Sequence, residues 1–437
     1  MTIPFLGKQK IKTLLSSDVA KAVAAMVSVN VLTATVGIVG SLIQGRFVTA
    51  EELGFFKQFS IATSYLFFLH LGSFHAVERL YPYYKGKKED KKAYEVVETA
   101  SSWVVLICLV ITAVFAVLTV KSLIGGDWKS GLCWFVQIVT IWGTLYGGFL
   151  QATYRSGKEF QSMARSTYLN PFLSAITIPL YWVQPFITMA IRSCTSMASV
   201  IRLHIRRPVK TGFSLNKKSL LNLFSEGLPL FSASYINSTG LDAIRNSIIL
   251  AMLGLTDLGL WTFSYQFLII IFMLPSAVTA VYAPRVVEKF AATESVSEAM
   301  KVARQPIKIG LLLSLAIVPL GILITYIFLP KILPNYANAI MIMIVLLLAT
   351  PLKLSDIYMS VISATRNRLL QNVISLMGFV TNVGVAVLGI VLGWGVISFA
   401  VSFFMGYVVR TICFMISIWK VSAKLEKSKI SNNNEIK

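Results

Sequence analysis

The sequence has few of the residues that most catalytic and metal sites use. Among 437 residues there are four cysteines and three histidines, and only 14% are charged, whereas a soluble domain usually has about 25% charged residues. The nucleotide-binding patterns GxxxxGK[ST] and GxGxxG are absent, and so is the GxSxG pattern of a nucleophilic serine. These absences exclude a soluble enzyme of ordinary composition and a disulfide framework. We therefore predict a protein that is not an enzyme and that needs no cofactor and no metal.

Long apolar runs are what the sequence has instead, with 56% hydrophobic residues and a mean hydropathy of +0.72. A membrane-spanning helix needs about 20 apolar residues. Single spans are predicted at residues 22–45, 58–77, 99–120, 130–154, 224–250, 258–284, 309–330 and 337–363. The runs 166–201 and 369–409 are too long for one crossing, so each is divided in two, at 183–185 and at 393–395. The total is twelve spans.

The net charge of +21 is distributed unevenly along the chain. Segments on the side of the amino terminus hold 31 of the 40 basic residues, whereas the opposite segments, which include Lys57, hold five. This bias predicts a multi-pass protein of the bacterial cytoplasmic (inner) membrane with both termini in the cytoplasm. The basic loops lack the motifs of nucleic-acid readers, so no nucleic acid is predicted as a partner.

The second half of the chain repeats short patterns of the first half. Residues 52–56 match residues 257–261 at an offset of 205, and Asn170 matches Asn382 at an offset of 212. Transporters are commonly built from such repeats; the alternative is chance similarity between apolar segments. The predicted fold is an all-α polytopic membrane protein with two pseudo-symmetric six-helix lobes around a central cavity. The lobes are residues 1–218 and 219–437, and the second ends in a short basic cytoplasmic tail.

Three segments resemble a known family. Residues 45–56 (GRFVTAEELGFF) resemble the segment after the first helix in polysaccharide exporters of the MOP superfamily. Residues 226–231 (EGLPLF) resemble the start of the seventh helix of these exporters, and residues 245–261 resemble the segment that comes after this start. The subgroup that the chain resembles most is the Wzx-type flippases of O-antigen and capsule repeat units. The lipid II branch carries arginines in its first helix, and residues 22–45 have none.

This resemblance implies a transporter with a central cavity. Its members move an undecaprenyl-pyrophosphate-linked oligosaccharide across the inner membrane for the synthesis of O-antigen or another surface polysaccharide. The implied partners are this lipid-linked oligosaccharide, membrane lipids and other surface-polysaccharide assembly proteins. Two alternatives stay open. One is an ion-coupled exporter of drugs or small molecules from the same superfamily, and the other is a membrane-embedded polysaccharide polymerase.

Transport of a diphosphate needs cations inside the membrane, and arginine suits phosphate because its guanidinium can bind two oxygens at once. Arg192 and Arg410 have no opposite charge one helical turn away on their own helices. An isolated intramembrane charge costs at least about 2.5–3.5 kcal/mol on insertion scales. Each arginine therefore lines a cavity, pairs with another helix or extends to the membrane surface. We take both as substrate-binding candidates.

Two further cations stand three residues from a carboxylate, Arg245 from Asp242 and Lys353 from Asp356. This spacing places each pair on one helical face. One interpretation is a self-neutralised pair that lowers the cost of insertion. The other makes Arg245 and Lys353 substrate-binding residues, while Asp242 and Asp356 exchange a proton or sodium ion during transport.

Three uncharged polar candidates complete the prediction. Asn30 and Asn170 lie inside predicted spans, where an amide either contacts the sugar or forms a hydrogen bond between helices. His70 lies in the second span and is a further ion-coupling candidate, because histidine titrates near neutral pH. A packing role is the alternative for His70.

Overall fold

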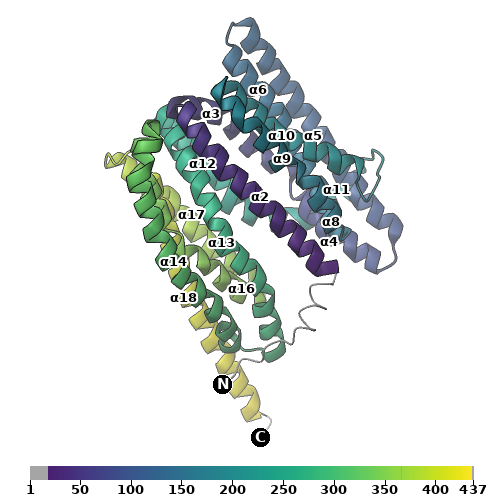
Figure 1. The fold of residues 1–437 in the computed structure, drawn as a ribbon. Coiled ribbons are helices and arrows are strands. Elements are labelled where there is room, and N and C mark those ends of the chain that lie inside the picture. Colours follow the sequence, from purple (N-terminus) through teal and green to yellow (C-terminus); the bar gives the residue numbers. More distant parts are fainter. Residues whose placement is uncertain (1–17, 366, 436–437) are drawn as a thin grey trace. The chain divides into compact units, whose positions relative to one another are not determined.

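The computed structural model describes residues 18–365 and 367–435, and within these residues the regular structure is helical, with no strand (Figure 1). The first 17 residues and the last two of the predicted basic tail lie outside the described residues. The predicted all-α fold is confirmed for the described part of the chain.

Helices of the first half vary in length from short helical turns to the 35 residues of α5. They are α2 (Asp18–Phe47), α3 (Ala50–Leu66), η1 (Phe67–His70), α4 (Ser73–Gly86), α5 (Asp90–Ile124), α6 (Trp128–Ile141), η2 (Trp142–Tyr146), α7 (Gly147–Ser156), α8 (Phe160–Thr167), α9 (Leu169–Thr177), η3 (Ile178–Trp182), α10 (Pro185–Ile205) and α11 (Lys217–Tyr235).

The second half contains longer helices. They are η4 (Ile236–Gly240), α12 (Leu241–Met252), α13 (Leu255–Thr293), α14 (Val296–Ile332), η5 (Pro334–Ala339), α15 (Ile340–Leu348), η6 (Pro351–Ser355), α16 (Asp356–Ala364), α17 (Arg368–Val391) and α18 (Ile397–Glu435).

Both predicted breaks in the long apolar runs are confirmed. The helical turn η3 ends at Trp182 and α10 begins at Pro185. Proline is well tolerated at the first position of a helix, because an N–H there would have no partner within the helix. Between α17 and α18, Gly393 and Gly395 have φ values of 81° and 59°, which glycine adopts without steric cost. The two apolar runs therefore become two helices each.

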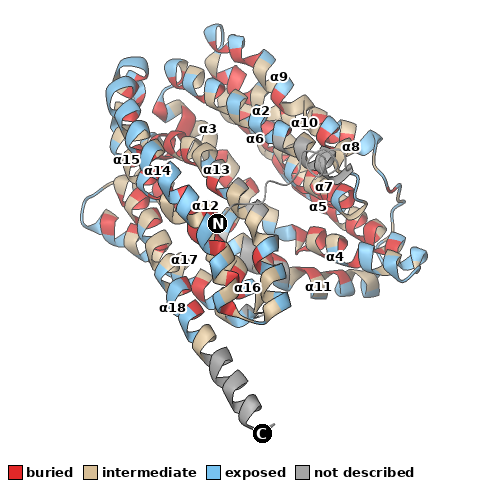
Figure 2. Cartoon of the chain, turned by 60° about the horizontal axis from the view of Figure 1, so that its bottom comes forward, coloured by how far each residue is buried: buried red, intermediate tan, exposed pale blue. Residues whose placement is uncertain are grey.

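Each of the twelve predicted spans coincides with helix. Eight helical stretches of the described residues are long and apolar enough to cross a membrane. The other four predicted spans fall on more polar or interrupted stretches, namely α3 to α4, α8 to η3, α10, and α11 to α12. On α14, Leu312 and Leu315 are 68% and 72% exposed, and pale blue stretches mark this exposure in Figure 2. Apolar exposure on this scale is typical of a surface that faces lipid, so the protein is a multi-pass membrane protein.

The chain divides into two compact units by its internal contacts. Unit 1 contains the residues up to Phe47 together with Phe59–Tyr235, and unit 2 contains Val48–Gln58 together with the residues from Ile236 onwards. The start of α3 therefore packs with the second half of the chain. The predicted lobe boundary at residues 218 and 219 stays a prediction.

Each unit has its own apolar core. In unit 1, α4, α5 and α7 share a core that includes Phe74, Val97 and Tyr154. The Tyr154 hydroxyl donates a hydrogen bond to the Leu203 carbonyl at 3.0 Å, which joins α7 to α10. In unit 2, α13, α14, α16 and α18 share a second apolar core, which includes the buried Phe414. These cores hold the helices that carry the candidate site residues.

A close backbone contact joins the two repeated segments within unit 2. A Cβ atom on Gly54 would overlap the Leu255 carbonyl, and a Cβ atom on Gly259 would overlap the Ala50 carbonyl. These glycines occupy matching positions in the repeat, because each is the fifth residue of its helix. Helices α3 and α13 therefore approach each other at a point where only glycine fits, as small residues permit in membrane helix packing.

We expect Gly54→Ala and Gly259→Ala each to lower the thermal stability of the purified protein. The added methyl group must displace backbone, and overpacking typically costs about 1–3 kcal/mol. The control is Gly384→Ala in α17, where an added Cβ meets open space, so the better helix propensity of alanine leaves stability equal or higher. Thermal unfolding in one detergent compares the three variants. A loss of stability in the control as large as in the other two would contradict this packing.

Candidate functional site

Five charged residues gather inside unit 2, and we call them the C-terminal charge cluster. They are Asp242, Arg245, Lys353, Asp356 and Arg410. The first two lie on α12 directly after the π-helical turn η4. The others come from η6, from the first residue of α16 and from α18. The π-helical turn is noteworthy because such turns occur frequently at functional sites.

Arg245 is the most deeply buried charge of the cluster, with a side chain that is 2% exposed. Its Nη1 donates to Asp242 Oδ1 at 2.8 Å, so the predicted pair on one helical face is confirmed. Its Nε and Nη2 are buried without a hydrogen-bond partner among the described residues. The guanidinium carbon lies 5.0 Å from the centre of the Trp261 ring and 5.3 Å from that of Phe403. Aromatic faces stabilise a cation at such distances but leave its hydrogen-bond donors unused.

Asp356 is shared by two cations. Lys353 Nζ lies 2.7 Å from Asp356 Oδ2, and Arg410 Nη2 forms an ion pair with Asp356 Oδ1. Arg410 thus pairs with another helix, which was one of the three alternatives predicted for it. Because one carboxylate faces two cations, this group keeps one positive charge in excess.

Aromatic rings connect the two charged groups within unit 2. The Phe403 ring lies beside Arg245 and has its centre 5.1 Å from that of Tyr407. Tyr407 in turn lies beneath Arg410, at 5.4 Å, and Lys353 Nζ lies 5.6 Å from the Phe272 ring. The cluster therefore forms one continuous network of cations and rings.

Lys57 is a cation of unit 2 that the sequence analysis placed in an outer segment. The structure places it inside α3, two turns from the helix start. A sequence signal for this helix start was present. Thr49 and Glu52 form a capping box, in which the Glu52 backbone N–H donates to Thr49 Oγ1 at 3.2 Å and the Thr49 N–H donates to Glu52 Oε2 at 3.3 Å.

Arg192 is the corresponding cation of unit 1 and is partly buried. Its Nη2 donates to the Val36 carbonyl at 3.2 Å, and its Nη1 is buried without a partner among the described residues. A Cβ on Gly40 would overlap the guanidinium. Because Gly40 has no side chain, the Arg192 guanidinium can pack directly against α2. The sequence analysis did not identify Gly40, because one glycine in an apolar helix carries no distinctive pattern.

The Thr195 hydroxyl connects Asn170 with the backbone of Arg192. Thr195 Oγ1 lies 2.9 Å from Asn170 Oδ1 and 2.8 Å from the Arg192 carbonyl. Its repeat counterpart, Asn382, donates to the Ser402 carbonyl at 3.3 Å. Both asparagines therefore bond to the next helix, α9 to α10 and α17 to α18, as expected for a hydrogen bond between helices.

Asn30 and His70 lie in different surroundings. Asn30 is exposed on α2. His70 is fully buried, and its ring lies 4.0 Å from the rings of both Phe74 and Phe231. Its Nδ1 accepts a hydrogen bond from the Gly72 N–H at 3.1 Å. This apolar environment favours the packing alternative for His70, and its coupling role stays a prediction, as do those of Asp242 and Asp356.

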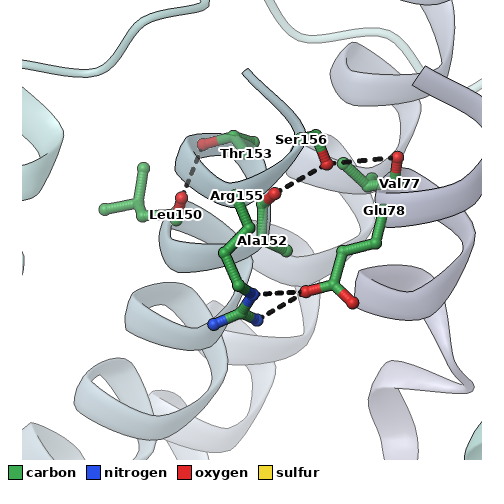
Figure 3. A network of polar contacts seen from close by, with 7 residues as sticks. All are labelled: Val77, Glu78, Leu150, Ala152, Thr153, Arg155 and Ser156. Atoms are coloured by element: carbon green, nitrogen blue, oxygen red, sulfur yellow. Dashed lines mark hydrogen bonds and ion pairs between the residues drawn. The ribbon is translucent and has the colours of Figure 1, made fainter. Parts of the chain in front are cut away.

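A charge-balanced pair in unit 1 provides a contrast. Figure 3 shows Arg155 of α7 donating through Nε to Glu78 Oε1 of α4 at 2.6 Å. Beside it, Ser156 Oγ donates to the Ala152 carbonyl at 2.7 Å. Here each charge has one partner, so this network serves to join α4 to α7. The unbalanced cations therefore stand out as the candidate site.

Comparisons with known proteins identify the fold. No protein-family model matches the chain, and no curated protein matches it by sequence. Among solved structures, an inward-facing multidrug resistance MATE family transporter of the MOP superfamily has 16% identity and a TM-score of 0.65, covering 90% of this chain and 96% of its own. The lipid II flippase MurJ, in an inward closed conformation, has 13% identity and a TM-score of 0.67, covering 92% of this chain and 90% of its own.

A third similar structure is a MOP superfamily transporter from Pyrococcus furiosus, described as having a binding pocket of reverse polarity. It has 16% identity and a TM-score of 0.56, covering 94% of this chain and 98% of its own. At these identities the likeness establishes the fold, which is that of MOP superfamily transporters. These structural neighbours are described as transporters or as a flippase.

We expect Asp356→Asn to destabilise the protein more than Lys353→Gln or Arg410→Gln does. Loss of the carboxylate leaves two partly buried cations without a partner, whereas loss of either cation leaves one ion pair intact. Breaking a buried pair costs about 3–5 kcal/mol. Thermal unfolding in detergent measures the order. Equal losses in all three variants would show that Asp356 is not the shared partner.

Proposed function

We propose that the protein is a transporter that moves an undecaprenyl-pyrophosphate-linked oligosaccharide repeat unit from the cytoplasmic to the outer leaflet of a bacterial inner membrane. The supporting fold is that of MOP superfamily transporters, which include a lipid II flippase. The repeat unit would serve O-antigen or another surface polysaccharide. The proposed orientation, with both termini in the cytoplasm, rests on the distribution of basic residues.

The observation that carries this proposal is a set of buried and partly buried cations, within the described helices, that outnumber their carboxylate partners. Unit 1 holds Arg192 without a carboxylate partner. In unit 2, Asp356 faces two cations, Lys353 and Arg410, whereas Asp242 pairs with Arg245. Unbalanced charge is costly in a medium of low dielectric constant, so such cations favour an anionic cargo. A diphosphate supplies that charge together with several hydrogen-bond acceptors.

Arg245 is suited to such a cargo in detail. Its Nε and Nη2 have no acceptor among the described residues, and a buried donor without an acceptor costs about 1–3 kcal/mol. A phosphate oxygen at these two atoms would satisfy both at once, in the fork geometry that guanidinium groups offer. The rings of Trp261 and Tyr265 lie beside the guanidinium and stabilise its charge.

The second candidate function is an ion-coupled exporter of small molecules. It is supported by the similar fold of a multidrug resistance MATE family transporter and by the rings of Trp261, Tyr265 and Phe403 around one buried charge. These rings suit organic cargo of several kinds. A cationic drug, however, would meet Arg245 and Lys353 at the same surface, which like-charge repulsion disfavours.

The test is deletion of the gene in its native cell, followed by analysis of surface glycan and of polyprenyl-linked glycans. We expect the surface glycan to be lost while its lipid-linked repeat unit accumulates inside. Complementation with Arg192→Gln or Arg245→Gln is expected to restore at most about a tenth of the glycan, because each charge-assisted contact to phosphate contributes about tenfold or more. Gly40→Ala is expected to act like Arg192→Gln, since it displaces the guanidinium without removing the charge.

The matched control is Lys88→Gln, which removes one positive charge from an exposed loop position and is expected to restore the glycan fully. Glycan that persists in the deletion strain, together with increased drug sensitivity, would contradict the flippase proposal and support the exporter. Full activity of both arginine variants would show that the buried cations do not hold the cargo.

A further inference from the structure

A polar pocket lies within unit 1, apart from the buried cations. It has a volume of about 150 Å³, roughly five times the volume of one water molecule in the liquid. Its walls come from α5, from η2 and α7, from the end of α10 and from the loop after α10. The polar lining includes Ser102, Tyr146, Thr153, His204 and Arg207. Tyr146 is the last residue of the π-helical turn η2, a kind of irregularity that recurs at binding sites.

The contacts of His204 with Arg207 and Tyr146 indicate which ring nitrogen carries the proton. Arg207 Nη1 lies 2.6 Å from His204 Nε2 and 3.1 Å from Nδ1, and a guanidinium can only donate. We assign Nε2 as the acceptor of a neutral ring, with the ring proton on Nδ1, because the contact of Arg207 with Nε2 is the shorter of the two. Since Nδ1 lies 2.5 Å from the Tyr146 hydroxyl oxygen, it donates to that oxygen. The hydroxyl hydrogen of Tyr146 is then free to donate into the pocket.

A second hydroxyl is oriented in the same way. Ser102 Oγ accepts a hydrogen bond from the Ser214 backbone N–H at 2.8 Å, so its own hydrogen is available to the pocket. His204 lies beyond the predicted span, which ends at residue 201, and burial together with the Arg207 guanidinium lowers the pKa of His204. This direction agrees with the neutral ring that the hydrogen bonds require.

The charge of the pocket is positive. Arg207 lines it, and no carboxylate is among its lining residues. The Glu98 carboxylate lies close to the lining residue Gly212, with Oε1 2.9 Å from where a Cβ on Gly212 would be, but Glu98 does not itself line the pocket. A pocket that offers a guanidinium and free hydroxyl hydrogens without a carboxylate is suited to an oxyanion.

Apolar surface continues from the pocket along the helices. Phe213, which lines the pocket, is 65% exposed, and Leu109, one turn beyond the lining residue Val105 on α5, is 54% exposed. Ile205 is also exposed beside His204. An acyl chain would find an apolar path here, next to a polar pocket at the cytoplasmic end of the predicted spans.

We propose that this pocket binds a phosphate oxyanion, and that the headgroup of an anionic phospholipid in the cytoplasmic leaflet supplies it. Arg207 pairs with the phosphate, and the hydroxyl groups of Tyr146 and Ser102 donate to its oxygens. The acyl chains lie along the exposed apolar face of α5. This site is separate from the cations of the proposed transport function and does not depend on that function.

The test is a lipid titration of the full-length purified protein by native mass spectrometry, with phosphatidylglycerol and phosphatidylcholine as probes. We expect one phosphatidylglycerol molecule to be retained in preference to phosphatidylcholine. Arg207→Gln is expected to weaken its binding about tenfold, and Tyr146→Phe about threefold without any change of charge. The matched control is Arg206→Gln, an exposed neighbour that does not line the pocket, for which we expect less than a twofold change.

Competition with inorganic phosphate at constant ionic strength distinguishes the two sources of the oxyanion. If phosphate does not displace phosphatidylglycerol, the result supports the lipid headgroup as the source. If phosphate displaces the lipid fully, and Arg207→Gln abolishes this displacement, the result supports the oxyanion pocket and overturns the lipid source. Equal weakening by Arg206→Gln and Arg207→Gln overturns the pocket, because general electrostatic attraction would then explain the binding. Unchanged binding in Tyr146→Phe overturns the proposed donor arrangement. Size-exclusion elution like that of the unaltered protein confirms that each variant is folded.

Discussion

A charge inside a bilayer must be balanced, because the surrounding medium cannot solvate it. This constraint explains the C-terminal charge cluster of unit 2, where each partly buried carboxylate faces a cation: Asp242 faces Arg245, and Asp356 faces both Lys353 and Arg410. It also identifies what the described helices leave unbalanced. An anionic cargo would bind at the unbalanced cations. Its release would leave these cations unbalanced again, which would favour binding of the next cargo molecule.

Helix packing places these charges, and small residues determine where helices approach closely. Gly40 leaves space for the Arg192 guanidinium, and the contact between Gly54 and Gly259 brings the start of α3 against α13. The second contact also brings Lys57 into unit 2. Backbone contact between two repeated segments gives the internal repeat a physical role, because both segments must carry glycine at the same position for either to fit.

Much of this fold could be predicted from the sequence, because long apolar runs and their breaks at Pro185 and Gly393 are local signals. The pairing of Asp242 with Arg245 was likewise visible as a spacing of three residues. The pairing of Asp356 with Arg410 was not, since these residues are 54 positions apart and only the tertiary fold unites them. Lys57 was placed in an outer segment because the predicted span 58–77 is a run without charged residues that begins directly after it, although the capping box at Thr49 marked the helix start.

The most direct test of the account is binding of a short polyprenyl diphosphate, such as geranylgeranyl diphosphate, to the purified protein in lipid nanodiscs. The account predicts saturable binding that is weaker for the monophosphate, weaker again for the neutral alcohol, and reduced about tenfold by Arg245→Gln. Equal binding of the diphosphate and the alcohol would contradict it, because the buried cations would then play no part in recognising the cargo.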